Sequence, residues 1–186
     1  MSAFVHLFDP PTRCVVGTVG EPGERTFFLQ VQDAERIISV ILEKDQVRIL
    51  AERMKDILDQ VAPKSSSSIP IDDAPLAQPI LAEFRIGILG LAWDDEENRI
   101  IIEAGSRVVE LAELDGLSEL TEDDEDEDEI VEGNEMLDIR LTVDLARGFV
   151  ERSLRVVKAG RHTCPFCGNL LDQKGHVCQR ANGYRR

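Results

Sequence analysis

Residues 26–61, with the sequence TFFLQVQDAERIISVILEKDQVRILAERMKDILDQV, set the architecture of the chain. Two runs rich in β-branched and aromatic residues, 26–32 and 36–42, flank the short turn Asp33-Ala34-Glu35, which is the pattern of a β-hairpin. In residues 44–61 the apolar side chains recur three and four positions apart, as one face of an amphipathic helix requires. The stretch therefore predicts a hairpin that leads directly into a helix.

A similar order of elements recurs towards the C-terminus. Residues 83–93 and 99–104 predict a second hairpin around an acidic turn, and residues 136–141 predict a strand that leads into a helix over 142–157. Thr142 or Asp144 is placed to cap this helix, because either side chain can accept a hydrogen bond from an unpaired amide of the first turn.

A shift of 99 residues superimposes the two predicted strand-to-helix junctions. Both follow the pattern LxxDxxRxxxERxxx and then two apolar residues: Leu42, Asp45, Arg48, Glu52 and Arg53 fall on Leu141, Asp144, Arg147, Glu151 and Arg152. The hairpin sequences at 30–40 and 91–104 are also alike. We interpret the pattern as two related halves, each a set of antiparallel strands that ends in a helix. Convergence on shared capping and amphipathic rules would look the same, so duplication and convergence both stay open.

The expected fold class is α+β, with an antiparallel sheet built from these two halves and two short strands, 4–8 and 13–19, at the start. Residues 1–160 are expected to form this body, and residues 161–186 a separate tail. Residues 62–80 hold four successive serines and four prolines, which predicts a flexible linker. Residues 117–134 contain eight consecutive acids, so we expect a solvated, disordered loop there; an interaction arm for a basic partner is the alternative.

Charge is divided unevenly along the chain. The formal net charge is −15, yet residues 155–186 hold seven basic residues and one acid, which leaves 14 basic and 35 acidic residues elsewhere. A body this acidic repels phosphates, so only the tail is expected to approach nucleic acid. No apolar run is long enough to cross a membrane, and the N-terminus lacks the features of a secretory signal. We therefore expect a cytoplasmic protein.

The tail carries the strongest chemical signal in the sequence. Cys164 and Cys167 are three positions apart around Pro165-Phe166, and His176 and Cys178 follow after Gly175. Three thiolates and one imidazole complete a tetrahedral set with no position left for water, which is typical of a structural zinc site. The sequence therefore predicts Zn²⁺ bound by Cys164, Cys167, His176 and Cys178 in a C-terminal zinc knuckle.

One ligand of this site has an alternative. His162 lies two residues before Cys164, and its imidazole is the other candidate for the fourth ligand in place of His176. A redox dithiol is disfavoured, because a redox CxxC pair lies at a helix N-terminus in a βαβ context, which this basic, glycine-rich tail lacks. A tail this short cannot bury a core of its own, so bound metal would provide its folding free energy.

Other chemistry-bearing residues receive structural interpretations. His6 alternates with apolar neighbours on a predicted strand, Cys14 lies in an apolar strand, and Trp93 is expected in the core. Residues 17–23 are rich in glycine but lack the Gly-Lys-Ser/Thr of a phosphate-binding loop, so a hairpin turn is expected there.

Three segments together resemble a known family. They are HLFDPPTRCVVGTVGEPGERTFFLQ near the start, LEKDQVRILAERMKDIL in the first helix, and CPFCGNLLDQKGHVCQRANGYRR at the end. These residues resemble the actinobacterial domain-of-unknown-function 3090 family. The resemblance implies a bacterial cytosolic protein and supplies no catalytic residue.

The function predicted from these observations is a non-catalytic binding or adaptor module that zinc stabilises, with a protein as its partner. One alternative is an enzyme for a phosphorylated or nucleotide-like ligand, in which Asp9, Arg13 and residues 17–23 would meet the tail arginines. The other is a protein that binds nucleic acid through its basic tail, with Tyr184 stacking on a base.

Overall fold

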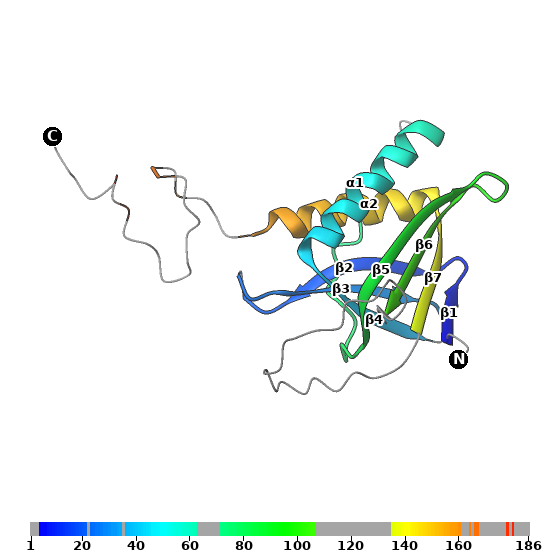
Figure 1. The fold of residues 1–186 in the computed structure, drawn as a ribbon, viewed down its shortest axis with the longest axis horizontal. Helices are drawn as coiled ribbons and strands as arrows, with labels where there is room; N and C mark the ends of the chain where they lie inside the picture. The colour runs from blue at the N-terminus through cyan, green and yellow to red at the C-terminus, as the bar shows by residue number, and fades with distance from the viewer. Residues whose placement is uncertain are drawn as a thin grey trace, which may run out of the picture.

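The computed structural model describes residues 4–21, 23–34, 36–62, 71–106 and 135–160, together with Cys164, Phe166, Cys167, Cys178 and Arg180 in the tail. Seven strands and two helices make up the described body (Figure 1). In chain order they are β1 (Phe4–Phe8), β2 (Arg13–Val19), β3 (Thr26–Gln32), β4 (Ile37–Leu42), α1 (Lys44–Val61), β5 (Ala82–Asp94), β6 (Arg99–Ser106), β7 (Glu135–Thr142) and α2 (Val143–Lys158). The predicted α+β class is confirmed.

The sheet is mixed, so the prediction of an antiparallel sheet is wrong at two places. The strand order is β1-β7-β6-β5-β4-β3-β2, and β1 pairs with β7, and β4 with β5, in parallel. Between β4 and β5 the chain passes through α1, and such a crossover returns it to the end of the sheet from which β4 started. The local patterns identified the strands correctly but carried no information about which strands pair across a long connection.

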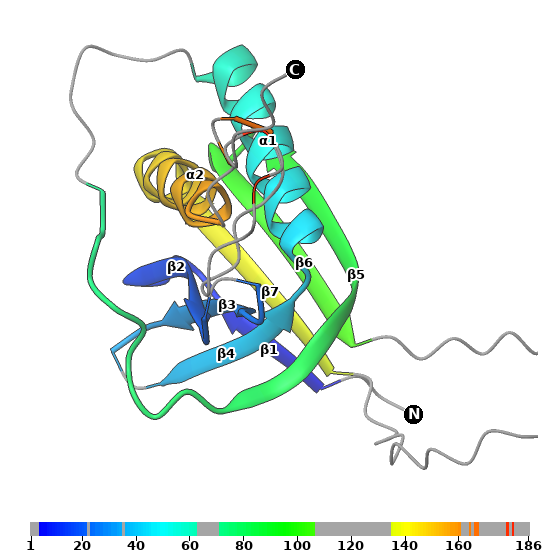
Figure 2. The ribbon, with the colours of Figure 1, turned by 90° about the vertical axis from the view of Figure 1, so that its left-hand side faces the viewer.

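The sheet is strongly curled. β1 and β2 are its two outermost strands, yet only residues 9–12 join them. Five residue steps span at most about 18 Å, whereas the outer strands of a flat seven-stranded sheet lie about 29 Å apart. The sheet therefore has to curl until its edges approach one another, and α1 and α2 lie together on the inner side of that curl (Figures 1 and 2).

The core lies between the helices and the inner face of the sheet. Inward side chains pair across neighbouring strands, for example Leu29 with Val40 and Ile102 with Ile139. Helix α2 packs against β2 near one edge and against β7 and β6 near the other, so it bridges the two ends of the sheet. Each fully buried aliphatic side chain contributes about 1.5–3 kcal/mol, and this continuous apolar cluster is what holds the curl closed.

The body is built from two similar units. Strands β2-β3-β4 and β5-β6-β7 are each an antiparallel meander, and each meander runs into a helix. The N-caps, Glu43 and Thr142, are 99 residues apart. The same shift superimposes the five buried apolar positions of α1 on buried positions of α2: Val47, Leu50, Ala51, Met54 and Leu58 fall on Ala146, Phe149, Val150, Ser153 and Val157.

The equivalence of the two units corrects one part of the repeat inferred from the sequence. Because β4 corresponds to β7, the β3–β4 turn corresponds to the connection at 107–134, and not to the β5–β6 turn at 95–98. The likeness between the hairpins at 30–40 and 91–104 therefore relates elements that are not equivalent in the fold. The predicted acidic loop at 117–134 lies outside the described residues.

Residues 71–81, which we call the strap, lie on the outer face of β2, β3 and β4, the side away from the helices (Figure 2). In the strap, Leu76 and Ile80 pack on Val15, Phe28 and Ile41, in an apolar cluster separate from the main core. The strap is the described part of the predicted linker, and it is anchored along the sheet by specific hydrogen bonds.

Candidate metal centre

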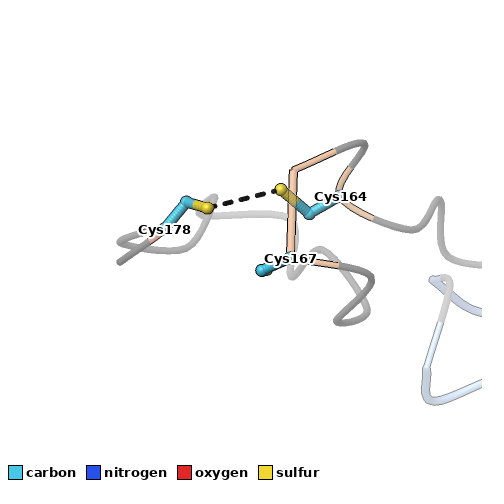
Figure 3. Close-up of side chains that lie close together, drawn as sticks. All are labelled: Cys164, Cys167 and Cys178. Atoms are coloured by element: carbon cyan, nitrogen blue, oxygen red, sulfur yellow. Dashed lines mark hydrogen bonds between the residues drawn. The ribbon is translucent and has the colours of Figure 1, made fainter. Parts of the chain in front are cut away.

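Three of the four predicted metal ligands come together in the tail. The sulfur atoms of Cys164, Cys167 and Cys178 all lie within 4.8 Å of one another, although 14 positions separate the first cysteine from the last. Figure 3 shows the sulfurs of Cys164 and Cys178 facing each other, with 3.7 Å between them. His176, the fourth predicted ligand, and the alternative His162 lie outside the described residues.

The spacing of the sulfurs suits a shared metal ion better than a disulfide. A disulfide bond is about 2.05 Å long, and all three cysteines are free thiols. With metal–sulfur bonds of about 2.3 Å, two sulfurs of a zinc tetrahedron lie about 3.8 Å apart. The observed 3.7 Å between Cys164 and Cys178 matches that edge. The donor set therefore fits a tetrahedral metal ion that prefers sulfur, and one position remains for a fourth ligand.

The local backbone favours the thiolate form of Cys164. Its sulfur accepts hydrogen bonds from the backbone amide of Cys167, the strongest influence, and from that of Phe166, and these bonds lower the pKa of Cys164 to about 7. The neighbouring thiols of Cys167 and Cys178 lower the pKa further, while burial of the sulfur opposes the shift. Amides that point inward from a turn are what a CxxC metal loop needs, because the thiolate is the form that binds metal.

A hydrogen bond that involves no cysteine also links the segment around Cys178 to the segment around Cys164 and Cys167. Nη1 of Arg180 donates a hydrogen bond of 3.3 Å to the carbonyl of Phe166, which directly precedes Cys167. Cys164 and Cys178 are buried, whereas Phe166 is largely exposed. Two of the three cysteines are thus buried, Cys167 is half-buried, and the neighbouring Phe166 is exposed.

The remaining cysteine, Cys14, lies outside this cluster. Cys14 is buried in β2 and belongs to the main core, and burial strongly raises the pKa of its thiol. The interpretation of Cys14 as a small buried hydrophobe is confirmed.

The residues proposed for an enzyme site are engaged elsewhere in the body. Asp9 accepts a hydrogen bond of 2.7 Å from Arg99, at the end of β1. Arg13 binds the strap through the carboxylate of Asp72. Residues 17–19 belong to β2, and Gly20 and Gly23, which follow it, take positive φ, as expected for a hairpin turn.

Sequence reasoning missed the polar residues that hold the strap. Gln30, Arg13 and Arg152 come from two strands and a helix. Arg152 lies in the repeated strand-to-helix pattern and Arg13 in the alternative enzyme site, but neither pattern pointed to a contact with residues 71–81. One signal was present for Gln30, a polar side chain in the middle of the apolar run TFFLQVQ, where an alternating strand pattern needs a reason for burying an amide. The amide of Gln30 is buried because it binds the main chain of the strap.

The fold and site define an α+β protein with a curled mixed sheet and a C-terminal cysteine cluster. The chain belongs to the family described as Protein of unknown function (DUF3090), whose model matches residues 6–178. That span includes all of the sheet except the first two residues of β1, both helices and all three clustered cysteines, so the predicted membership of this family is confirmed. No curated protein and no solved structure matches the chain. No described helix is long and apolar enough to cross a membrane.

Proposed function

We propose that this protein is a non-catalytic binding or adaptor module whose C-terminal tail is a zinc knuckle. The observation that carries the proposal is a cluster of three sulfurs within 4.8 Å of one another, in which the Cys164–Cys178 pair lies 3.7 Å apart, close to the edge of a zinc tetrahedron. Cys164, Cys167 and Cys178 supply the thiolates, and His176 supplies the fourth ligand. With four protein ligands the ion has no open position, so its role is to fold the tail.

The exposed surface of the knuckle supports recognition as its task. Phe166 is 61% exposed on the turn between two metal ligands, and the sequence around it is basic. An exposed aromatic residue in a basic segment of the chain suits a protein partner with an acidic, partly apolar surface. Metal would therefore act on binding indirectly, by holding Phe166 in place.

The metal content of the untagged, full-length protein tests the first half of the proposal. Inductively coupled plasma mass spectrometry should find one zinc ion per chain in the wild type and none in Cys164→Ser, while Cys14→Ser, the matched control, keeps its zinc. Zinc retained by His176→Ala but lost from His162→Ala would move the fourth ligand to His162. A wild type without metal contradicts the zinc assignment.

A comparative capture experiment tests the second half. Proteins retained from the native cytosol by the wild type should be lost with Cys164→Ser and with Phe166→Ala, because the first unfolds the knuckle and the second removes its exposed ring. Phe166→Ala should still bind zinc. If both variants retain the same proteins as the wild type, the knuckle is not the recognition element.

Nucleic acid is a second candidate partner, on one specific observation. The chain enters the tail at Gly160, and a Cβ placed there would lie 3.7 Å from Nζ of Lys44 and 3.8 Å from Nη2 of Arg25. These two cations extend the positive charge of the tail onto the body, where phosphates would meet both. A gel shift with single-stranded RNA at low salt should be lost in Arg25→Ala/Lys44→Ala. The absence of any shift at low salt would dispose of this candidate.

A further inference from the structure

The strap is held to the sheet in the way that a protein holds a bound peptide. Three carbonyls of the strap between Asp72 and Pro75 accept hydrogen bonds from the guanidinium groups of Arg13 and Arg152, which lie on β2 and α2. Nη2 of Arg13 donates to the carbonyls of Ala74 and Pro75, at 3.0 Å in both cases. Side chains of the body thus bind the main chain of the strap, whatever its side chains are.

Gln30 makes a two-point contact with the strap. Its Oε1 accepts a hydrogen bond of 2.7 Å from the amide of Ala77, and its Nε2 donates one of 3.1 Å to the carbonyl of the same residue. Ser39 Oγ and Arg13 Nη1 hold the Gln30 amide in this orientation. The Gln30 side chain thus pairs with both the N–H and the C=O of one strap residue, as the main chain of an edge strand does with an added extended chain.

Two side chains of the strap add selectivity. The carboxylate of Asp72 lies between two cations, 2.5 Å from Nε of Arg13 and 3.5 Å from Nη1 of Arg152. Leu76 fills the space above Gly17, where an added Cβ would come within 2.5 Å of the leucine Cγ. Gly17 thus leaves a notch that matches one aliphatic side chain, four residues after the acid.

We propose that this surface is a binding site for an extended acidic peptide of another protein, and that the strap is the copy of the ligand that the chain itself supplies. The strap site consists of Arg13, Gly17, Gln30 and Arg152. The ligand it fits has an Asp, an aliphatic residue four positions later and an extended main chain between them. The strap then acts as a competitor that a partner has to displace.

The charges around the site favour an acidic ligand. Arg155 binds Asp73 at 2.7 Å, so two successive carboxylates of the strap meet three arginines. The rest of the body is acidic, so this run of arginines is a local exception that selects against basic peptides.

Direct binding of the strap sequence in trans tests the proposal. The full chain carrying Asp72→Ala and Leu76→Ala, which weakens the internal ligand, would be titrated into a fluorescein-labelled peptide IDDAPLAQPIL. Fluorescence anisotropy should show saturable binding to this variant, at least about tenfold tighter than to the wild type. In the wild type the intact strap competes with the peptide at an effective concentration of about 1 mM. Cys164→Ser should leave this binding unchanged, which separates the test from the zinc knuckle.

Matched controls locate the binding. Peptides with Ala in place of the Asp at position 72 or the Leu at position 76 should each bind at least about tenfold more weakly, a difference of about 1.4 kcal/mol. Adding Gln30→Ala to the weakened chain should abolish binding, while adding Arg53→Ala, a change on the exposed face of α1, should not.

If circular dichroism shows that the Asp72→Ala/Leu76→Ala chain is unfolded, amide hydrogen exchange on the wild type replaces the titration. Excess peptide should speed exchange of the Ala77 amide, which Gln30 protects while the strap is bound. Failure of the peptide to bind a folded, weakened chain at about 1 mM, or an unchanged exchange rate at Ala77, overturns the proposal. A wild-type dimer that the peptide dissociates would also overturn it, because the occupant would then be the strap of a second copy.

Discussion

Helices α1 and α2 share one sequence pattern, yet their equivalent arginines lie in opposite environments. Arg48 and Arg53 of α1 fall on Arg147 and Arg152 of α2 when the chain is shifted by 99 residues. The side chain of Arg48 is 43% exposed, and Arg53 is exposed as well. The side chains of Arg147 and Arg152 are only 7% and 9% exposed.

The difference comes from what covers each helix, and not from the helix itself. Arg147 lies under the C-terminal end of α1, where it donates to the carbonyls of Leu58 and Ala62 at 3.0 and 2.5 Å. Arg152 lies against the edge of β2 and the strap, where it donates to Val16 and Ala74. Within the described residues nothing covers the arginines of α1 in this way, so the same residue type is a solvated surface charge there.

The largest contrast is expected between Arg152→Ala and Arg53→Ala. Removing Arg152 leaves the carbonyls of Val16 and Asp72 without their guanidinium donor and takes away one of the two cations beside the Asp72 carboxylate, which should lower the free energy of unfolding by about 3–5 kcal/mol. Its counterpart Arg53→Ala should change it by less than about 0.5 kcal/mol. Urea denaturation followed by circular dichroism measures both. Equal effects would show that the cover over α2 contributes nothing to stability.

A somewhat smaller contrast is expected between Arg147→Ala and Arg48→Ala. No basic residue lies in the last turn of α1, so Arg147 of the neighbouring helix supplies the cation that satisfies the carbonyls at this helix end. We expect Arg147→Ala to cost about 2–4 kcal/mol and Arg48→Ala at most about 0.5 kcal/mol. Amide exchange should speed up in the last turn of α1 in the first variant only. Uniform acceleration along the whole helix would contradict a role in capping.

The two helices also show how far the sequence could be read. Apolar spacing located the helices, and the seven strands were found, because these patterns depend on neighbours within a few residues. Arg147 and Arg152 are buried by segments that lie 78–136 positions away in the chain, and no local pattern encodes such contacts. The parallel pairing of β4 with β5 was not predicted, for the same reason. The cluster of three cysteines was predictable because their spacing within a short tail is local information.

The notch at Gly17 gives a third test, which separates packing from charge. Gly17→Ala should lower stability by about 1–3 kcal/mol, because the new Cβ would come within 2.5 Å of Leu76. In a Leu76→Ala background the same change should cost little, since the space it needs is already empty. A double-mutant cycle in urea measures this coupling. Additive effects would show that Leu76 does not occupy the notch in solution.

The smallest expected effect concerns the carboxylates that face the two buried arginines. Hydrogen bonding from Arg13, followed by the amide of Ala74 and the charges of Arg13 and Arg152, lowers the pKa of Asp72 below its usual 3.8. The pKa of Asp59 is lowered mainly by Lys55 and then by Arg147. A lowered pKa in the folded state means that each ion pair stabilises the protein above about pH 4, and that this contribution is lost as the pH falls through the folded-state pKa.

Asp72→Asn should therefore be less stable than the wild type at pH 7, and the gap should close as the pH falls below 3.8. The Asp72 side chain is 37% exposed, so solvent screening limits the gap at pH 7 to about 1 kcal/mol or less. Asp59→Asn should show the same sign of pH dependence, because its carboxylate has the same relation to Arg147 as Asp72 has to Arg152. Urea midpoints recorded between about pH 2.5 and pH 7 measure both. If the wild type were still more stable than these variants at the lowest pH, the two side chains would stabilise the protein through packing and hydrogen bonding, and not through their charge.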